Sequence, residues 1–136
     1  MARTAAAPER ILYTETSTFG GQRELRVHEG VLTCTLQACE GLATDSVTPE
    51  RSAWQGLWEL MEELRAWEWA GEYADPAACD AVRWELEVHW SGRHLRAAGC
   101  QRWPGAAGEF ERFLGALREM ATCDCRPQVT PKAAVV

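Results

Sequence analysis

The stretch VRWELEVHW at residues 82–90, followed by Ser91-Gly92 and by RHLR at residues 93–96, decides the fold. Its apolar residues alternate without fault with polar ones, which is the pattern of a strand with one buried and one hydrated face. Ser91-Gly92 favours a two-residue turn, so a second strand should run back antiparallel from Arg93. We therefore predict a β-hairpin.

The two-residue turn also sets the register of that hairpin. It pairs Trp90 with Arg93, His89 with His94, Val88 with Leu95 and Glu87 with Arg96. Apolar side chains then meet on the inner face and opposite charges meet on the outer face, which favours this pairing. The register predicts that the two imidazoles lie side by side on the hydrated face.

Upstream of the hairpin, Thr, Val, Leu and Tyr are frequent and are interrupted by Gly20-Gly21 and Glu29-Gly30, which are common turn signals. This pattern predicts three strands in an antiparallel meander. Their ranges are about Ile11–Thr18, Arg23–His28 and Val31–Gln37. Residues 40–47 are polar, and we predict a loop there.

Two amphipathic helices are predicted from apolar residues that recur every three or four positions. The first should begin at Thr48-Pro49, a capping residue before a proline, and should stop near Gly71. Its stripe is Trp54, Leu57, Trp58, Met61 and Leu64. The second should span about residues 107–121, with Phe110, Phe113, Leu114, Leu117 and Met120 as its stripe.

Residues 71–80 are rich in Gly, Ala, Asp and Pro and indicate a connection.

These elements predict one α+β domain over residues 1–121, in the order β-β-β-α-β-β-α. An antiparallel sheet of about five strands should carry both helices on its single apolar face. A chain of 136 residues suits one core. Residues 122–136 turn to Pro, Lys, Ala and Val, and we predict a flexible C-terminal tail.

Charge and hydropathy exclude several classes of function. The net charge is −6, and the arginines near the hairpin alternate with Glu85 and Glu87, so we expect no nucleic-acid binding. No apolar run is long enough for a signal peptide or a membrane span, so we expect no membrane partner and a cytoplasmic location. The six cysteines should there be reduced thiols.

Catalytic motifs are also absent, since the sequence has no G-x-S-x-G and no phosphate-binding glycine loop between a strand and a helix. The cysteines lack the paired spacing of structural zinc sites. We therefore expect no enzymatic activity and no cofactor. The alternative that stays open is a thiol- or metal-dependent function that uses Cys100 with His89 and His94, the two histidines being weak candidates for metal ligands.

Seven tryptophans are many for this length, and we expect most of them in the core. Aromatic residues that remain near the connections predict a contact surface, because Trp, Tyr and Arg dominate the energetics of protein interfaces. The candidate residues are Trp67, Trp69, Tyr73, Arg102 and Trp103. The sequence thus predicts a non-enzymatic protein-binding module whose partner is another protein or, in a homodimer, its own copy.

A family resemblance points the same way. It is carried by the run Ser17-Thr18-Phe19-Gly20-Gly21, the helix that bears Trp and Leu, the alternating strand closed by Gly92, and Pro104 before a last helix. In these features the chain resembles a loose group of small bacterial β-β-β-α-β-β-α proteins that includes the emfourin-like inhibitors of thermolysin-type metalloproteases and uncharacterised relatives. The similarity covers about residues 11–120 and rests on the order of the elements. It implies the β-β-β-α-β-β-α fold and protease inhibition, and no inhibitory residue is matched position by position.

Overall fold

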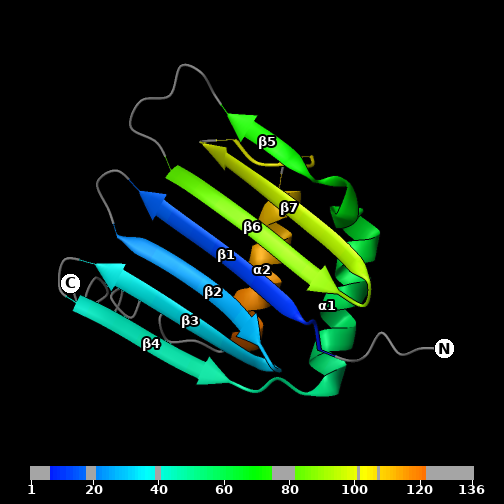
Figure 1. Cartoon of the computed structure of the whole chain (residues 1–136), viewed down its shortest axis with the longest axis horizontal. Helices are drawn as coiled ribbons and strands as arrows, with labels where there is room; N and C mark the ends of the chain where they lie inside the picture. The colour runs from blue at the N-terminus through cyan, green and yellow to red at the C-terminus, as the bar shows by residue number, and fades with distance from the viewer. Residues whose placement is uncertain are drawn as a thin grey trace.

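The computed structural model describes residues 7–17, 21–38, 41–74, 82–100, 102–106 and 108–121. In chain order its elements are β1 (Arg10–Ser17), β2 (Gln22–His28), β3 (Val31–Ala38), β4 (Gly41–Val47), α1 (Arg51–Leu64), the 3-10 helix η2 (Ala66–Glu68), β5 (Gly71–Ala74), β6 (Val82–Trp90), β7 (Arg93–Cys100) and α2 (Glu109–Ala121) (Figure 1). The predicted tail at residues 122–136 lies outside the described residues.

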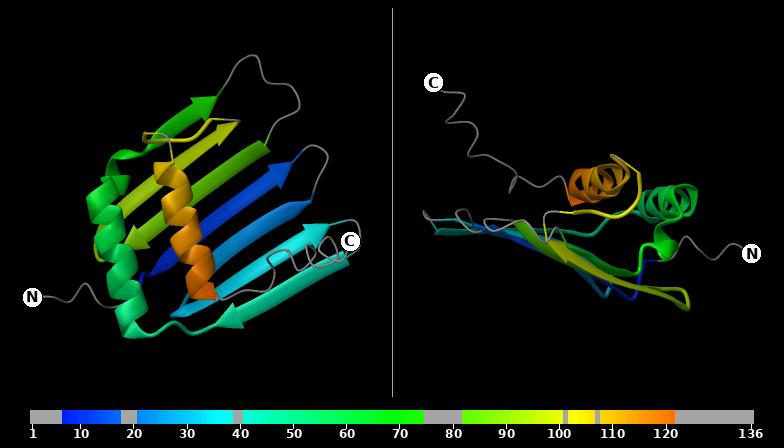
Figure 2. Two further views of the ribbon diagram at one scale, coloured as in Figure 1. Left: turned by 180° about the vertical axis from the view of Figure 1, so that it is seen from behind. Right: turned by 90° about the horizontal axis from the view of Figure 1, so that it is seen from above.

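The strands form one sheet in the order β4-β3-β2-β1-β6-β7-β5. Neighbouring strands are antiparallel except β5 and β7, which are parallel. Figure 2 shows α1 and α2 side by side on one face of the sheet, and no helix of the described residues lies on the other face, called here the helix-free face. The predicted α+β class is confirmed, but within the described residues the sheet is mixed and has seven strands rather than about five antiparallel ones.

Two hairpins turn through two residues of left-handed backbone. Ser91 and Gly92 have φ of 51° and 84°, and Glu29 and Gly30 have φ of 52° and 80°. Positive φ at both central residues is typical of the type I′ turn, whose twist matches that of the strands. All four predicted pairs of the β6–β7 hairpin are confirmed, including His89 opposite His94.

The polar segment predicted as a loop at residues 40–47 is instead the edge strand β4, so that prediction was wrong. Its side chains are exposed on both faces apart from Val47, which removes the alternation that marks a half-buried strand. Backbone pairing with β3 holds the strand, and the hydroxyls of Ser46 and Thr33 lie 3.1 Å apart across the pair.

The first helix also differs from the prediction at both ends. α1 begins at Arg51, with Glu50 as N-cap in an extended conformation, rather than at Thr48-Pro49. It ends at Leu64, because Arg65 takes the left-handed conformation (φ 58°) and its backbone N–H reaches back to the last turn. The chain can therefore turn through η2 and reach β5, where a plain connection was predicted.

One hydrophobic core lies between the sheet and the helices. Trp90 meets Trp54 and Trp58 edge-on, with ring centroids 6.0 and 5.2 Å apart, and Trp84 packs on Phe110 at 4.8 Å. Trp54, Trp69, Trp84 and Trp90 are buried, and Trp58 and Trp67 are partly buried, so the prediction that most indoles are core is confirmed. Within the described chain, no helix has the length and apolar character needed to cross a membrane.

Candidate functional site

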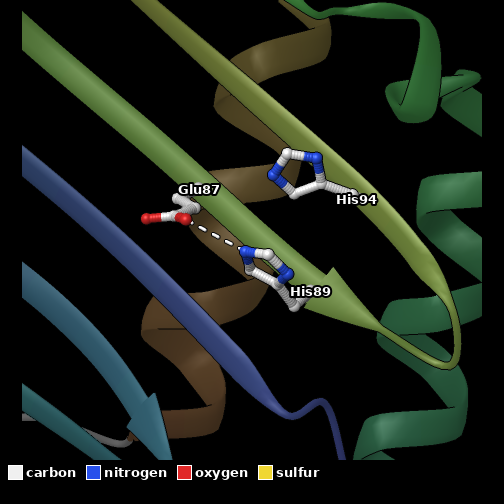
Figure 3. A group of neighbouring side chains, drawn as sticks. All are labelled: Glu87, His89 and His94. Carbon is white, nitrogen blue, oxygen red and sulfur yellow. Dashed lines mark hydrogen bonds and ion pairs between the residues drawn. The ribbon is translucent and has the colours of Figure 1, made fainter.

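A cluster of two histidines and a glutamate lies on the helix-free face. Glu87 and His89 are alternate residues of β6, and His94 is directly opposite His89 on β7. Their neighbours Val88 and Trp90 point into the core, so the three side chains point outward together (Figure 3). One ligand atom from each residue lies within 4.8 Å of the others, and the imidazole centroids are 4.4 Å apart.

Charges around Glu87 keep it ionised. His89 Nε2 lies 2.9 Å from Glu87 Oε2, and because an ionised carboxylate only accepts, the imidazole donates. This hydrogen bond lowers the pKa of the Glu87 carboxyl, and the positive charges of Arg10 and Arg96 lower it further. Arg10 Nε is 3.5 Å from the second carboxylate oxygen, Oε1. The cluster therefore offers a carboxylate and imidazole nitrogens, which are metal ligands.

Cys100 does not join this cluster. It lies on the same face of β7 as His94 but opposite Arg83, six residues further along the strand. At about 3.3 Å per residue, the two backbones are roughly 20 Å apart. The structure therefore does not bring Cys100 together with the two histidines that the sequence analysis grouped with it.

The residues of the predicted contact surface do not form one surface. Trp69 is only 4% exposed, because η2 turns it onto Phe110 and Phe113 of α2. Tyr73 is half-buried, and its hydroxyl donates to the carbonyl of Trp69 at 2.8 Å. The Trp69 side chain thus belongs to the core.

Trp67, also predicted at this surface, is half-buried and covered by Arg93. The Arg93 guanidinium lies 5.3 Å from the Trp67 ring centroid and 5.7 Å from that of Trp58, and it is held by Glu62 at 2.8 Å. The Trp67 ring is therefore part of a structural contact that joins Arg93 of β7 to η2 and to α1.

The last two candidates, Arg102 and Trp103, border a pocket of about 550 Å³ on the helix side. Trp103 is 39% exposed. We call this the arginine pocket, and it is lined by Arg23 of β2, Arg118 of α2, Arg102 and Trp103 from the connection before α2, and Tyr13 and Glu15 of β1. In the described part of the chain, none of its three arginines forms a salt bridge.

Tyr13 forms the buried wall of the arginine pocket. Its hydroxyl donates to Glu15 Oε1 at 2.8 Å. Burial raises the pKa of Tyr13, and the charge of Glu15 and this hydrogen bond raise it further, while Arg23 and Arg118 act in the opposite direction. The neutral phenol is therefore strongly favoured in the folded protein.

This raised pKa predicts a loss of stability in alkali. Above pH of about 10 the unfolded chain releases the Tyr13 proton and the folded chain keeps it, so the free energy of unfolding falls as the pH rises. Urea denaturation between pH 8 and 11 should show the fall, and Tyr13→Phe should reduce it. Tyr73→Phe is the control and should leave the fall in place; an identical pH profile in both variants would contradict the assignment.

Sequence reasoning missed Glu87, Arg23 and Arg118 as members of these sites. Glu87 had a visible signal, since it is two residues from His89 on the same strand and must share its face. Arg23 and Arg118 carry no local signal, because only the packing of α2 against the sheet brings them together.

Comparisons with protein-family models and with curated proteins give no match to this sequence.

Proposed function

We propose that the protein is a non-enzymatic binding module whose arginine pocket holds an acidic segment of a partner protein. The observation that carries the proposal is an exposed tryptophan, Trp103, at the border of a pocket lined by three guanidinium groups. Trp and Arg are among the residue types that most often dominate the binding energy at protein interfaces.

Charge supports an acidic partner segment. The whole chain carries −6, yet three arginines line this pocket beside two carboxylates, Glu15 and Glu111. A planar guanidinium recognises a carboxylate through two parallel hydrogen bonds, which gives both energy and orientation. Trp103 offers an apolar face for the residue next to that carboxylate.

The experiment uses a fluorescein-labelled octapeptide that alternates Asp with Phe, and measures its binding to the full chain by fluorescence anisotropy. Arg102→Glu and Trp103→Ala should each weaken binding at least about tenfold, since hot-spot residues contribute about 2 kcal/mol or more and about 1.4 kcal/mol is tenfold. Both residues are exposed, so the variants should fold normally. Arg26→Glu is the matched control, because Arg26 is an exposed β2 arginine on the helix-free face.

Three results would contradict the proposal: equal binding of a peptide with Asn in place of Asp, equal loss of affinity in Arg26→Glu and Arg102→Glu, or a dimer that Trp103→Ala dissociates, which would assign the surface to a second copy.

Inhibition of a thermolysin-type protease stays a prediction from the resemblance. It is checked by adding the protein to such a protease and following peptide hydrolysis.

A further inference from the structure

The helix-free face carries a second, independent group of functional side chains, Glu87, His89 and His94. The β6–β7 hairpin fixes their backbones, because a two-residue turn allows one register and that register sets His89 opposite His94. β6 is internal to the sheet, and at Glu87 and His89 it pairs with β1 on one side and β7 on the other. β5 pairs with β7 only at Ala97–Cys100, so at His94 β7 is paired with β6 alone. Glu87 and His89 therefore start from a rigid support, and the hairpin register holds His94 opposite them.

Their distances are close to those of a metal site. Metal–nitrogen and metal–oxygen bonds of about 2.0–2.2 Å place ligand atoms roughly 3 to 3.5 Å from one another. His89 Nε2 and Glu87 Oε2 are already 2.9 Å apart, and the three ligand atoms lie within 4.8 Å of each other. An ion bound there takes the place of the proton that Nε2 donates to Oε2, and that proton is released to solvent or moves to Nδ1. His94 is exposed and the His89 side chain is 42% exposed, so small rotations can close the set without disturbing the core.

We propose that Glu87, His89 and His94 bind a divalent transition-metal ion of the zinc, copper or nickel type. Imidazole nitrogen suits these ions, whereas Mg²⁺ and Ca²⁺ prefer sets made of oxygen atoms. Three protein ligands on an open sheet face leave at least one coordination position for water or another ligand.

Two arginines shape the site from its sides. Arg10 on β1 lies beside Oε1 of Glu87, while Oε2 faces His89. Arg10 therefore orients the carboxylate in the way that a second-sphere hydrogen-bond partner orients a ligand in many metal sites. Arg96 is the cross-strand neighbour of Glu87. The site has one anionic ligand, Glu87, and two neighbouring cations, Arg10 and Arg96. We therefore expect it to bind a metal ion more weakly than a four-ligand structural site does.

The test is calorimetric titration of the full chain with ZnCl₂ and, separately, NiCl₂. Accessible thiols are first alkylated with iodoacetamide, because thiolates also bind these ions. The expected result is one ion per chain. His94→Gln and Glu87→Gln should each lower the affinity at least about tenfold, since even the loss of an outer partner costs 10–100-fold.

His28→Gln is the matched control. His28 is the one histidine of the sequence outside the proposed site. Its Nε2 is 3.7 Å from Glu29 Oε2, so it also lies beside a carboxylate, but no second imidazole is adjacent to it. Arg10 pairs with both His28 and His89, which puts His28 two strands, roughly 10 Å, from His89. Its replacement should leave the affinity unchanged.

Spectroscopy with Cu²⁺ adds a readout that does not depend on affinity. Electron paramagnetic resonance of the one-to-one complex should show coupling to two imidazole nitrogens in the wild type and to one in His94→Gln. The proposal is overturned if neither ion binds to the alkylated wild type, if His94→Gln keeps full affinity, or if His28→Gln loses as much affinity as His94→Gln. Because the arginine pocket is on the opposite face, peptide binding there is a separate result.

Discussion

Replacing Trp84 with alanine will lower the free energy of unfolding by about 3–5 kcal/mol, the usual cost of deleting a large aromatic side chain from a core. Trp84 is fully buried at the centre of the aromatic cluster, between Phe110 at 4.8 Å and Tyr73 at 6.2 Å. Its Nε1 also donates to the carbonyl of Arg102 at 2.8 Å. The variant therefore loses packing on α2 and on β5, and one hydrogen bond.

Urea denaturation of the full chain measures this loss, and Trp84→Phe separates its two parts. Phenylalanine keeps most of the ring contacts but leaves the Arg102 carbonyl without its donor, at a cost of about 1–3 kcal/mol. Trp103→Ala is the control, because an exposed indole should change stability by only about 0.5 kcal/mol. A Trp84→Ala variant no less stable than Trp103→Ala would contradict the role assigned to this ring.

The features of this fold that could be predicted are those encoded locally. The β6–β7 hairpin follows from period-two alternation and from Ser91-Gly92, and these two signals place His89 beside His94. The helix stripes follow from the period of 3.6 residues. Two of the three candidate metal ligands could therefore be placed side by side before any tertiary contact was known.

The features that were missed depend on tertiary pairing. β4 is hydrated on both faces and has no alternation, and β5 is a four-residue strand whose parallel pairing with β7 no local pattern encodes. The sequence did not indicate that α1 ends at Leu64, because the left-handed residue that follows it is Arg65 rather than the usual glycine. The arginine pocket joins β2, α2 and the connection before α2, so its charges meet only after packing.

Gly99→Ala is the second large effect that we expect, a loss of about 1–3 kcal/mol from overpacking, and more where backbone must move. A Cβ added at Gly99 would lie 2.6 Å from Trp84 Nε1, 2.6 Å from the Tyr73 carbonyl oxygen and 2.7 Å from the Arg102 carbonyl oxygen. Two of these atoms are backbone, so the clash cannot be relieved by rotating a side chain. The added methyl must displace β5 or the connection that carries Arg102.

Gly56→Ala is the matched control, since it adds the same methyl where there is space. Gly56 is exposed within α1, and a Cβ there meets no atom within 4 Å. Alanine in a helix interior is more stable than glycine by about 0.5–1 kcal/mol, so this variant should gain stability. Thermal and urea denaturation should give opposite signs for the two substitutions. Equal effects would mean that Gly99 has room for a side chain, and that β5 and the Arg102 connection do not close over it as described.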